Sequence, residues 1–227
     1  MKMYNIAVVP ARSGSKRIPA KNIKEINGKP LIYWTLKAAE EAECIHKVFV
    51  STDSIEYIRI IDALKVLYKF DKTYPIPRES KHATAKSQIE DFMIPLIAKN
   101  KCDNVILLQP TSPVRLPGTI DRAFKLFIEE NADALVSVTR LNKFIWQDNK
   151  PNYNILKRPR SQEYKPNIFL ENGSIYITKR DILLNTFSRV GGEKIVTFEL
   201  TPEESFEIDE ELDFLICETI LSKYIRR

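Results

Sequence analysis

Four cationic side chains crowd a short stretch near the N-terminus, VVPARSGSKRIPAKN (residues 8–22), where small residues separate Arg12, Lys16, Arg17 and Lys21. The first acidic residue of the chain is Glu25, so these cations have no carboxylate close to them in the sequence. Small residues let backbone N–H groups approach an anion, and the cations add charge that a di- or triphosphate would neutralise. We expect this stretch to bind a phosphorylated ligand rather than to form a solvated basic loop.

The stretch is not a common phosphate-binding motif. Gly14 is its only glycine, so it matches neither GxxxxGK[ST] nor GxGxxG. A generic P-loop or a dinucleotide site is therefore disfavoured.

A second chemical constellation lies near the C-terminus, in FEIDEELD (residues 206–213). On an extended backbone Glu207 and Asp209 point to one face and Ile208 to the core, whereas on a helix the two carboxylates would diverge. Two convergent carboxylates together with phosphate oxygens suit Mg²⁺. The alternative is that these acids favour the N-terminus of the following helix through its dipole, which is the role we assign to Asp213.

Alternating strand-like and helix-like segments must position these residues. The strands are expected at 4–10, 47–52, 104–109, 134–140 and 194–200, with an extended segment at 168–179 that breaks at Asn172-Gly173; the helices are expected at 29–43, 54–67, 86–100, 118–131 and 210–225. This rhythm predicts an α/β fold with a doubly wound, mainly parallel, Rossmann-like sheet. Ligands bind such sheets at the carboxyl ends of strands, which is where residues 11–22 should lie.

The segment 141–168 breaks this rhythm, because it is polar, basic and contains three prolines. A connection of this length is typically functional. Its apolar residues Phe144, Ile145 and Trp146 indicate burial on association with another subunit. In the final helix, the expected packing face carries four residues: Leu212, Leu215, Ile216 and Thr219.

Length and composition indicate a single globular α/β domain. The chain has 227 residues, 44% hydrophobic and 29% charged, which fits one large α/β domain over residues 1–227. No stretch approaches the length of a membrane span, and the N-terminal apolar run is too short for a signal peptide, so we expect a cytoplasmic protein that does not contact a membrane.

The net charge of +5 does not by itself indicate nucleic-acid binding, since 35 cations and 30 anions are mostly interspersed. An RNA-binding protein would need clustered surface aromatics and a broader basic face. Three well-separated cysteines and two separated histidines give poor support to a zinc site or a Ser-His-Asp triad, and we expect buried thiols.

The stretch PARSGSKRIPAKNIKEINGKPLIYWTLKAA resembles the N-terminal signature of the CMP-N-acetylneuraminate synthetase (acylneuraminate cytidylyltransferase) family, which includes legionaminate and pseudaminate cytidylyltransferases. The resemblance continues in order through VSTDS, LLQPTSPVR, KRPRSQ, ENGSIYI and FEIDEELDF, over nearly the whole chain. It implies a nucleotide-diphospho-sugar transferase-like fold, with segment 141–168 as an inserted dimerisation and sugar-binding arm, and a homodimer. It also implies a reaction in which CTP and a nine-carbon 2-keto sugar acid give a CMP-sugar and pyrophosphate, with Mg²⁺ as cofactor.

Matching positions carry the family's roles onto this chain. For CTP these are Ala11, Arg12, Lys16, Lys21, Asn22, Arg78 and Ser87, with Arg12, Lys16, Lys21 and Asp209 as catalytic residues. For the metal they are Glu207 and Asp209. For the sugar they are Gln109, Arg160, Gln162 and Tyr176. Here Arg160 matches a basic position suited to a carboxylate, and core packing is the alternative for Tyr176.

Two positions depart from the family pattern. Glu207 stands where the family usually has Asp, and Ala83 stands where an acid is common. These departures leave open a non-catalytic nucleotide-binding module, and the exact acid (N-acetylneuraminic, legionaminic or pseudaminic) also stays open. A CMP-Kdo synthetase is disfavoured, because its opening motif reads differently.

Overall fold

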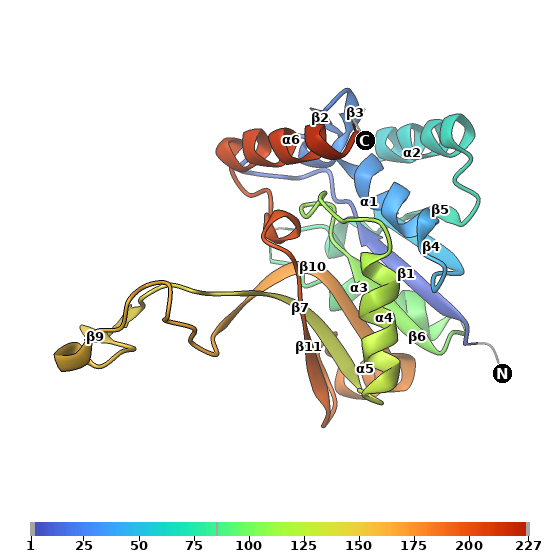
Figure 1. Ribbon diagram of the computed structural model, residues 1–227. Helices are drawn as coiled ribbons and strands as arrows, with labels where there is room; N and C mark the ends of the chain where they lie inside the picture. Colours follow the sequence, from blue (N-terminus) through green and yellow to red (C-terminus); the bar gives the residue numbers. More distant parts are fainter. Residues whose placement is uncertain (1–2, 85, 226–227) are drawn as a thin grey trace.

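The computed structural model describes residues 3–84 and 86–225, and its centre is a seven-stranded sheet with the strand order β11-β7-β10-β6-β1-β4-β5 (Figure 1). All neighbouring strands pair in parallel except β10, which is antiparallel to both β6 and β7. The prediction of a mainly parallel sheet is confirmed. The strands are β1 (Asn5–Pro10), β4 (Lys47–Thr52), β5 (Thr73–Pro77), β6 (Asn104–Leu108), β7 (Ala134–Arg140), β10 (Phe169–Lys179) and β11 (Ile195–Glu199).

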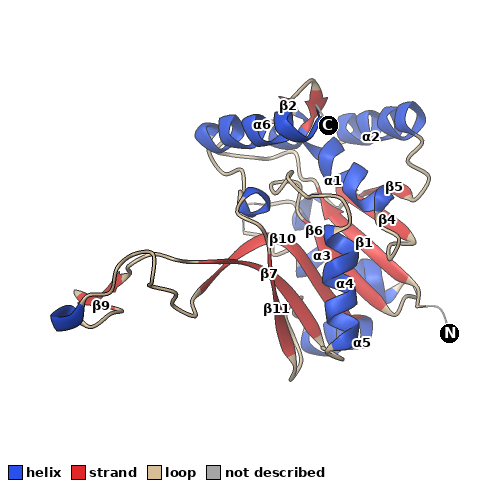
Figure 2. Cartoon of the chain, in the orientation of Figure 1, coloured by secondary structure: helices blue, strands red, loops and turns tan. Residues whose placement is uncertain are grey.

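Helices cover both faces of this sheet (Figure 2). One apolar cluster joins the sheet to α1 (Leu31–Glu41), α2 (Ile55–Tyr68) and α4 (Thr119–Glu129), and a second joins it to α3 (Glu90–Ala98) and α5 (Arg180–Thr186). Along β1 the residues alternate between the clusters, because successive side chains of a strand point to opposite faces. A strand buried on both sides reads as a continuous apolar run, which is why these strands were visible in the sequence.

The chain order creates a switch point between β1 and β6. From β1 the chain runs outward through β4 to β5, and then returns to place β6 on the other side of β1. Crossover connections therefore leave the carboxyl ends of β1 and β6 in opposite directions, which opens a crevice between them. The basic loop (residues 11–22) follows β1 and Gln109 follows β6, so both lie at this crevice.

The last helix, α6 (Glu211–Ile225), packs on loop segments and the start of α1 and not on the sheet, and the basic loop contributes Ile18 to this contact. Its buried face is formed by Phe214, Cys217, Ile220 and Leu221, which contact Ile18, Ile26, Leu31, Val114 and Ile208. The predicted face is wrong in part: Leu212 and Leu215 are exposed, and Thr219 is exposed as well. Because the helix covers a loop rather than a flat sheet, its register is set by that loop and could not be read from periodicity.

The arm (residues 141–168) leaves the sheet between β7 and β10 and projects away from the body of the protein (Figure 1). Its base is closed by a 2.9 Å hydrogen bond from the Leu141 N–H to the Ile168 carbonyl oxygen. It carries a short hairpin of β8 (Trp146–Gln147) and β9 (Lys150–Pro151), and a helical turn at Ile155–Lys157. Phe144, Tyr153 and Tyr164 pack against one another, so most of the arm's aromatic surface is used within the arm.

Several elements were not anticipated. Strand β5 has the sequence TYPIP, and its two prolines hid it; prolines are tolerated there because β5 is an edge strand. Helix α5 and the two-stranded ribbon of β2 (Glu25–Ile26) and β3 (Lys29–Pro30) are too short to show a period. Helix α3 begins at Glu90, four residues later than expected.

The helices and the cysteines can also be compared with the predictions from the sequence. Within residues 3–84 and 86–225 no helix is long and apolar enough to cross a membrane. All three cysteines are free, and Cys217 is buried while Cys44 and Cys102 are partly exposed.

We predict that Phe214→Ala lowers the free energy of unfolding by about 3–5 kcal/mol, because it removes a buried ring from the apolar cluster that joins α6 to Ile18, Ile26 and Leu31. Urea unfolding measures this loss. Thr219→Ala, on the exposed side of the same helix, is the control and should stay within about 0.5 kcal/mol. Equal losses for the two variants would contradict the observed helix face.

Candidate functional site

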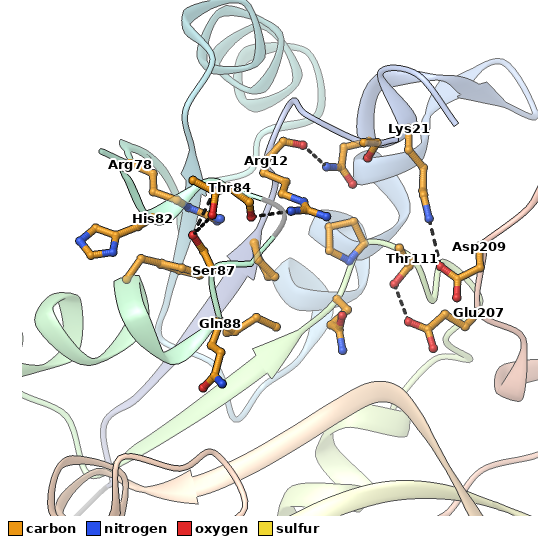
Figure 3. Close-up of a pocket in the computed structure, with 17 residues that line it drawn as sticks. Arg12, Lys21, Arg78, His82, Thr84, Ser87, Gln88, Thr111, Glu207 and Asp209 are labelled. Carbon is orange, nitrogen blue, oxygen red and sulfur yellow. Dashed lines mark hydrogen bonds and ion pairs between the residues drawn. The ribbon is translucent and has the colours of Figure 1, made fainter. Parts of the chain in front are cut away.

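A cavity of about 290 Å³ lies at the crevice between β1 and β6 (Figure 3). Four separate stretches of the chain line it: the end of β1 with the basic loop, the segment from Arg78 to Phe92, residues 109–111 after β6, and the residues before α6. Eight of the residues predicted for the site line this cavity: Arg12, Lys21, Asn22, Arg78, Ser87, Gln109, Glu207 and Asp209.

The basic loop and the carboxylates before α6 touch each other. The Lys21 ammonium is buried and donates to the Ile208 carbonyl oxygen at 2.5 Å, and its Nζ lies 3.4 Å from Asp209 Oδ1. On the solvent side, Arg17 Nη1 lies 3.0 Å from Asp209 Oδ2. Ile208 is fully buried, so Glu207 and Asp209 face the cavity together, as an extended backbone requires. Asp213 caps the start of α6 by accepting from the Asp209 and Glu210 N–H groups, as predicted.

Arg12 crosses the mouth of the cavity. Its Nη1 donates to the Thr84 carbonyl oxygen at 2.7 Å, and the Arg12 carbonyl oxygen accepts from the Asn22 side chain at 2.9 Å. The loop is further held by Asp53, whose carboxylate accepts from the Ser13 N–H and hydroxyl. Lys16 is exposed and does not line the cavity. Ala11 is fully buried, and its N–H already donates to the Ser51 carbonyl oxygen.

Arg78 forms the far wall. It follows edge strand β5, donates to the Ser51 hydroxyl at 3.0 Å and carbonyl at 2.6 Å, and stacks 3.7 Å from the centroid of the Phe92 ring. Burial lowers the pKa of Arg78 to about 10. A fixed, partly desolvated guanidinium is a strong donor toward an anion or a polar base edge. Ser87 is held beside it, donating to the Lys81 carbonyl oxygen at 3.1 Å.

Glu207 is the most confined carboxylate of the cavity. Its Oε1 accepts from the Thr111 hydroxyl at 3.0 Å, and burial raises its pKa, helped by the nearby Asp209. Gly173, with φ of +65°, lies directly against it: a methyl group built on Gly173 would lie 2.9 Å from Gln109 Nε2 and 3.1 Å from Glu207 Oε1. Only glycine provides both the conformation and the space there. Asn172 does not share the positive φ; its side chain accepts from the Ser137 hydroxyl and donates to the Thr139 hydroxyl.

Three predicted sugar residues lie outside the cavity. Arg160 and Gln162 are on the arm and exposed, with Arg160 3.9 Å from Glu163. Tyr176 is 3% exposed and packs in the sheet core, and its hydroxyl donates to Glu171. Core packing, the alternative to a sugar contact, is therefore where the structure has this residue. Its pKa is raised, mainly by burial.

Sequence reasoning missed several residues that shape the site. His82 ends a three-residue 3-10 helix, and Thr84 and Gln88 follow it outside any helix or strand; all three line the cavity, and no periodicity pointed to them. Thr111 and Arg115 are also absent from the residues expected for the site. Thr111 contacts Glu207 through its hydroxyl and Ile208 through its carbonyl. Arg115 donates to the Thr35 hydroxyl and to two backbone carbonyl oxygens.

The donor set fits a magnesium ion held together with phosphates. Glu207 and Asp209 are the two carboxylates of the cavity, and the described part of the chain contains no cluster of three or more His, Cys, Asp or Glu side chains. Mg²⁺ is commonly bound by one or two carboxylates together with substrate phosphates and water.

The fold is shared with solved structures at low sequence identity. CMP:2-keto-3-deoxy-manno-octonic acid synthetase in complex with CTP superposes with a TM-score of 0.71 at 18% identity, covering 97% of this chain and 99% of that one. A 4-diphosphocytidyl-2C-methyl-D-erythritol synthase from Anaerococcus prevotii also gives 0.71 at 11% identity, covering 100% of both chains. This likeness shows that the chain shares its predicted α/β fold, with a mainly parallel central sheet, with these two structures.

A family model described as cytidylyltransferase matches residues 6–224. Since this match spans nearly the whole chain, the protein belongs to the cytidylyltransferase family.

The chain is also similar in sequence to several curated proteins. The chain is 34% identical to CMP-N,N'-diacetyllegionaminic acid synthase of Legionella pneumophila, over 96% of this chain and 97% of that protein. It is 32% identical to N-acylneuraminate cytidylyltransferase B of Danio rerio over 95% of this chain, and to N-acylneuraminate cytidylyltransferase of Escherichia coli over 100%. The chain spans about half the length of the last two relatives (51% and 54%).

We predict that Glu207→Gln raises the free energy of unfolding at pH 7, measured without divalent metal. Burial raises the pKa of Glu207 in the folded protein, so the charged form opposes folding above its unfolded pKa of about 4.3. The gain should vanish below about pH 4, where Glu207 is protonated in both states.

Urea unfolding at pH 7 and pH 3.5 measures both values, with exposed Glu210→Gln as the control. Destabilisation by Glu207→Gln at pH 7, or an undiminished gain at pH 3.5, would refute this account.

Proposed function

We propose that this protein is a cytoplasmic, Mg²⁺-dependent nucleotidyltransferase that makes a CMP-activated nine-carbon acidic sugar of the sialic or legionaminic type from CTP and the free sugar, releasing pyrophosphate. One observation carries the proposal: the basic loop after β1 and the carboxylates before α6 line a single cavity at the switch point of the sheet. Membership of the cytidylyltransferase family supports the nucleotide, and the likeness to legionaminate and N-acylneuraminate enzymes supports the sugar class.

The cations of the basic loop would hold the triphosphate. Arg12, Lys21 and Asn22 line the cavity, and Lys16 is an exposed residue of the same loop. Attack of the sugar's anomeric hydroxyl on the α-phosphorus forms the new P–O bond and breaks the bond to pyrophosphate, where negative charge accumulates. Fixed positive groups at that point stabilise the transition state. Arg78, Ser87 and the backbone of Ala11 and Arg12 would receive the nucleoside.

Glu207 and Asp209 would hold the magnesium ion. When bound, the ion supplies positive charge to the triphosphate. Thr111 fixes the direction of the Glu207 carboxylate, and Lys21 and Arg17 fix that of Asp209. The longer Glu207 side chain fits because Gly173 leaves room beside it.

The sugar would lie beside Gln109 and Gly173, with its carboxylate bound by Arg160 and Gln162 from the arm. Since Arg160 and Gln162 do not line the cavity of their own chain, we propose that they reach the cavity of a second copy in a homodimer. Tyr176 then acts from the core, by supporting strand β10.

Charge and exposure support the homodimer. The arm carries six Lys or Arg side chains and two acids, while the acidic segment (residues 199–213) carries eight acids and no cation. Leu156 on the arm is 98% exposed and Trp146 is 60% exposed. Leu212 within the acidic segment and Leu215 just after it are exposed as well. Apolar side chains in complementary charged surroundings are typical of surfaces that associate.

Purified protein with CTP, Mg²⁺ and a panel of nine-carbon 2-keto acids should release pyrophosphate with at least one acid. Asp209→Ala should abolish turnover, and Glu210→Ala, an exposed neighbour outside the cavity, should retain it. CTP binding measured by calorimetry without pyrophosphate release from any acid would favour a non-catalytic nucleotide-binding module instead.

We predict that mixing two impaired variants restores turnover. In a heterodimer of Arg160→Ala and Asp209→Ala, one site combines an intact Asp209 with the intact Arg160 of the other chain. After subunit exchange, about one quarter of wild-type activity should return at an acid concentration below KM.

Sedimentation should show a dimer for both variants at micromolar concentration. If the mixture stays as inactive as its components although both are dimeric, Arg160 does not act in the partner's site. A monomeric wild type would refute the dimer itself.

A further inference from the structure

Arg115 is a partly buried cation that no carboxylate neutralises directly. Its Nη1 donates to the Thr35 hydroxyl at 2.9 Å, and its Nη2 donates to the carbonyl oxygens of Gln109 at 2.9 Å and Ser174 at 2.7 Å. None of the ion pairs within the described residues involves Arg115, and its buried Nε has no hydrogen-bond partner among them. Burial lowers its pKa, to about 9.

The two carbonyls mark the point where strands β6 and β10 separate. Their antiparallel ladder ends at the pair Leu108 and Ile175. The next pair in register would be Gln109 and Ser174, and Arg115 Nη2 bonds the carbonyl oxygens of both. The guanidinium therefore stands where the next rung of the ladder would be, and it satisfies carbonyls that lose their strand partner there.

We call the Arg115 guanidinium, with its bonds to the Gln109 and Ser174 carbonyl oxygens, the wedge. The wedge lies next to the cavity. Gln109 lines the cavity, and Gly173 precedes Ser174 on the other strand. A methyl group on Gly173 would lie 2.9 Å from Gln109 Nε2, so the two strands approach each other closely on the cavity side. Arg115 does not itself line this cavity. It can act on a ligand there only through the backbone of Gln109 and Ser174.

We propose that Arg115 is a positioning residue that sets the separation of Gln109 and Gly173, and so the fit of the acidic sugar. This inference rests on the proposed function for its substrate, but the wedge itself does not. The planar guanidinium serves three acceptors in fixed directions from one rigid group. A lysine keeps the charge but lacks this fork, so Arg115→Lys lets the two strand ends shift.

The first test compares the two substrates. Arg115→Lys should raise KM for the acid about ten- to a hundredfold, since small misplacements of positioning groups have effects of this size. KM for CTP should change less than twofold, because the nucleoside wall around Arg78 is held by Ser51 and not by Arg115. Equal effects on both substrates would overturn the proposal.

Arg122→Lys is the matched control. Arg122 donates to the Pro117 carbonyl oxygen and the Thr119 hydroxyl in the neighbouring loop, but to no residue of the cavity. It should leave both KM values unchanged. An equal rise in the acid KM would show that any loosening of this loop suffices, which would overturn the special role of Arg115.

A double-mutant cycle tests whether the effect passes through Gln109. Gln109→Ala removes the side chain that Arg115 positions but keeps its carbonyl. In this background Arg115→Lys should raise the acid KM less than threefold further, because coupled residues are not additive. Full additivity of the two substitutions would overturn the proposal.

Amide hydrogen exchange gives a readout that needs no activity. Arg115→Lys should accelerate exchange in residues 109–112 and 173–176 and leave residues 48–52 and 74–78 unchanged. Exchange that stays as in wild type, or that accelerates across the whole sheet, would overturn the wedge. If the wild-type protein releases no pyrophosphate with any acid, the proposed function fails. The hydrogen-exchange comparison of wild type with Arg115→Lys still decides whether Arg115 sets the separation of the two strands.

Discussion

The contact of Lys21 with the residues before α6 holds the site together. The basic loop alone would be a set of mutually repelling cations, and the segment 206–213 alone would be a set of repelling carboxylates. The Lys21 ammonium bonds the Ile208 carbonyl oxygen and lies beside Asp209, joining positions 187 and 188 residues apart. Because Lys21 is buried, this attraction is less screened than a surface ion pair. The apolar cluster of α6 and Ile18 forms around the same junction.

The cations of the loop are already committed to acceptors of the protein. Arg12 donates to Thr84, Arg17 pairs with Asp209, and Lys21 bonds Ile208. A triphosphate would exchange with or join these acceptors, so the positive groups are oriented before the ligand arrives. Preorganised charge of this kind needs little rearrangement during a reaction, which is the main way a protein stabilises charge that develops in a transition state.

The part of the cavity around Glu207, on the same side as Lys21 and Asp209, is shaped by the backbone as well as by charge (Figure 3). The antiparallel strand β10 brings Gly173 beside Gln109, and the positive φ of Gly173 leaves space for the longer carboxylate of Glu207. Thr111 fixes this region from the cavity wall, and Arg115 fixes it from outside the cavity. The departure from Asp at position 207 is therefore accommodated by its neighbours. It does not by itself speak against a metal-binding role.

The strands buried on both faces, the mainly parallel core and the two charged stretches at the cavity could be predicted from the chain, because continuous apolar runs and unpaired charge are local properties. Other positions depend on contacts between segments far apart in the sequence. Tyr176 lies in the core, Leu212 and Leu215 face outward, and Arg115 is partly buried against β6 and β10 for this reason. The exposed position of Arg160 on a projecting arm likewise follows from where the chain leaves the sheet. Local sequence patterns specify which residue types are available, but only the packing of distant segments fixes which face is buried and which side chains meet.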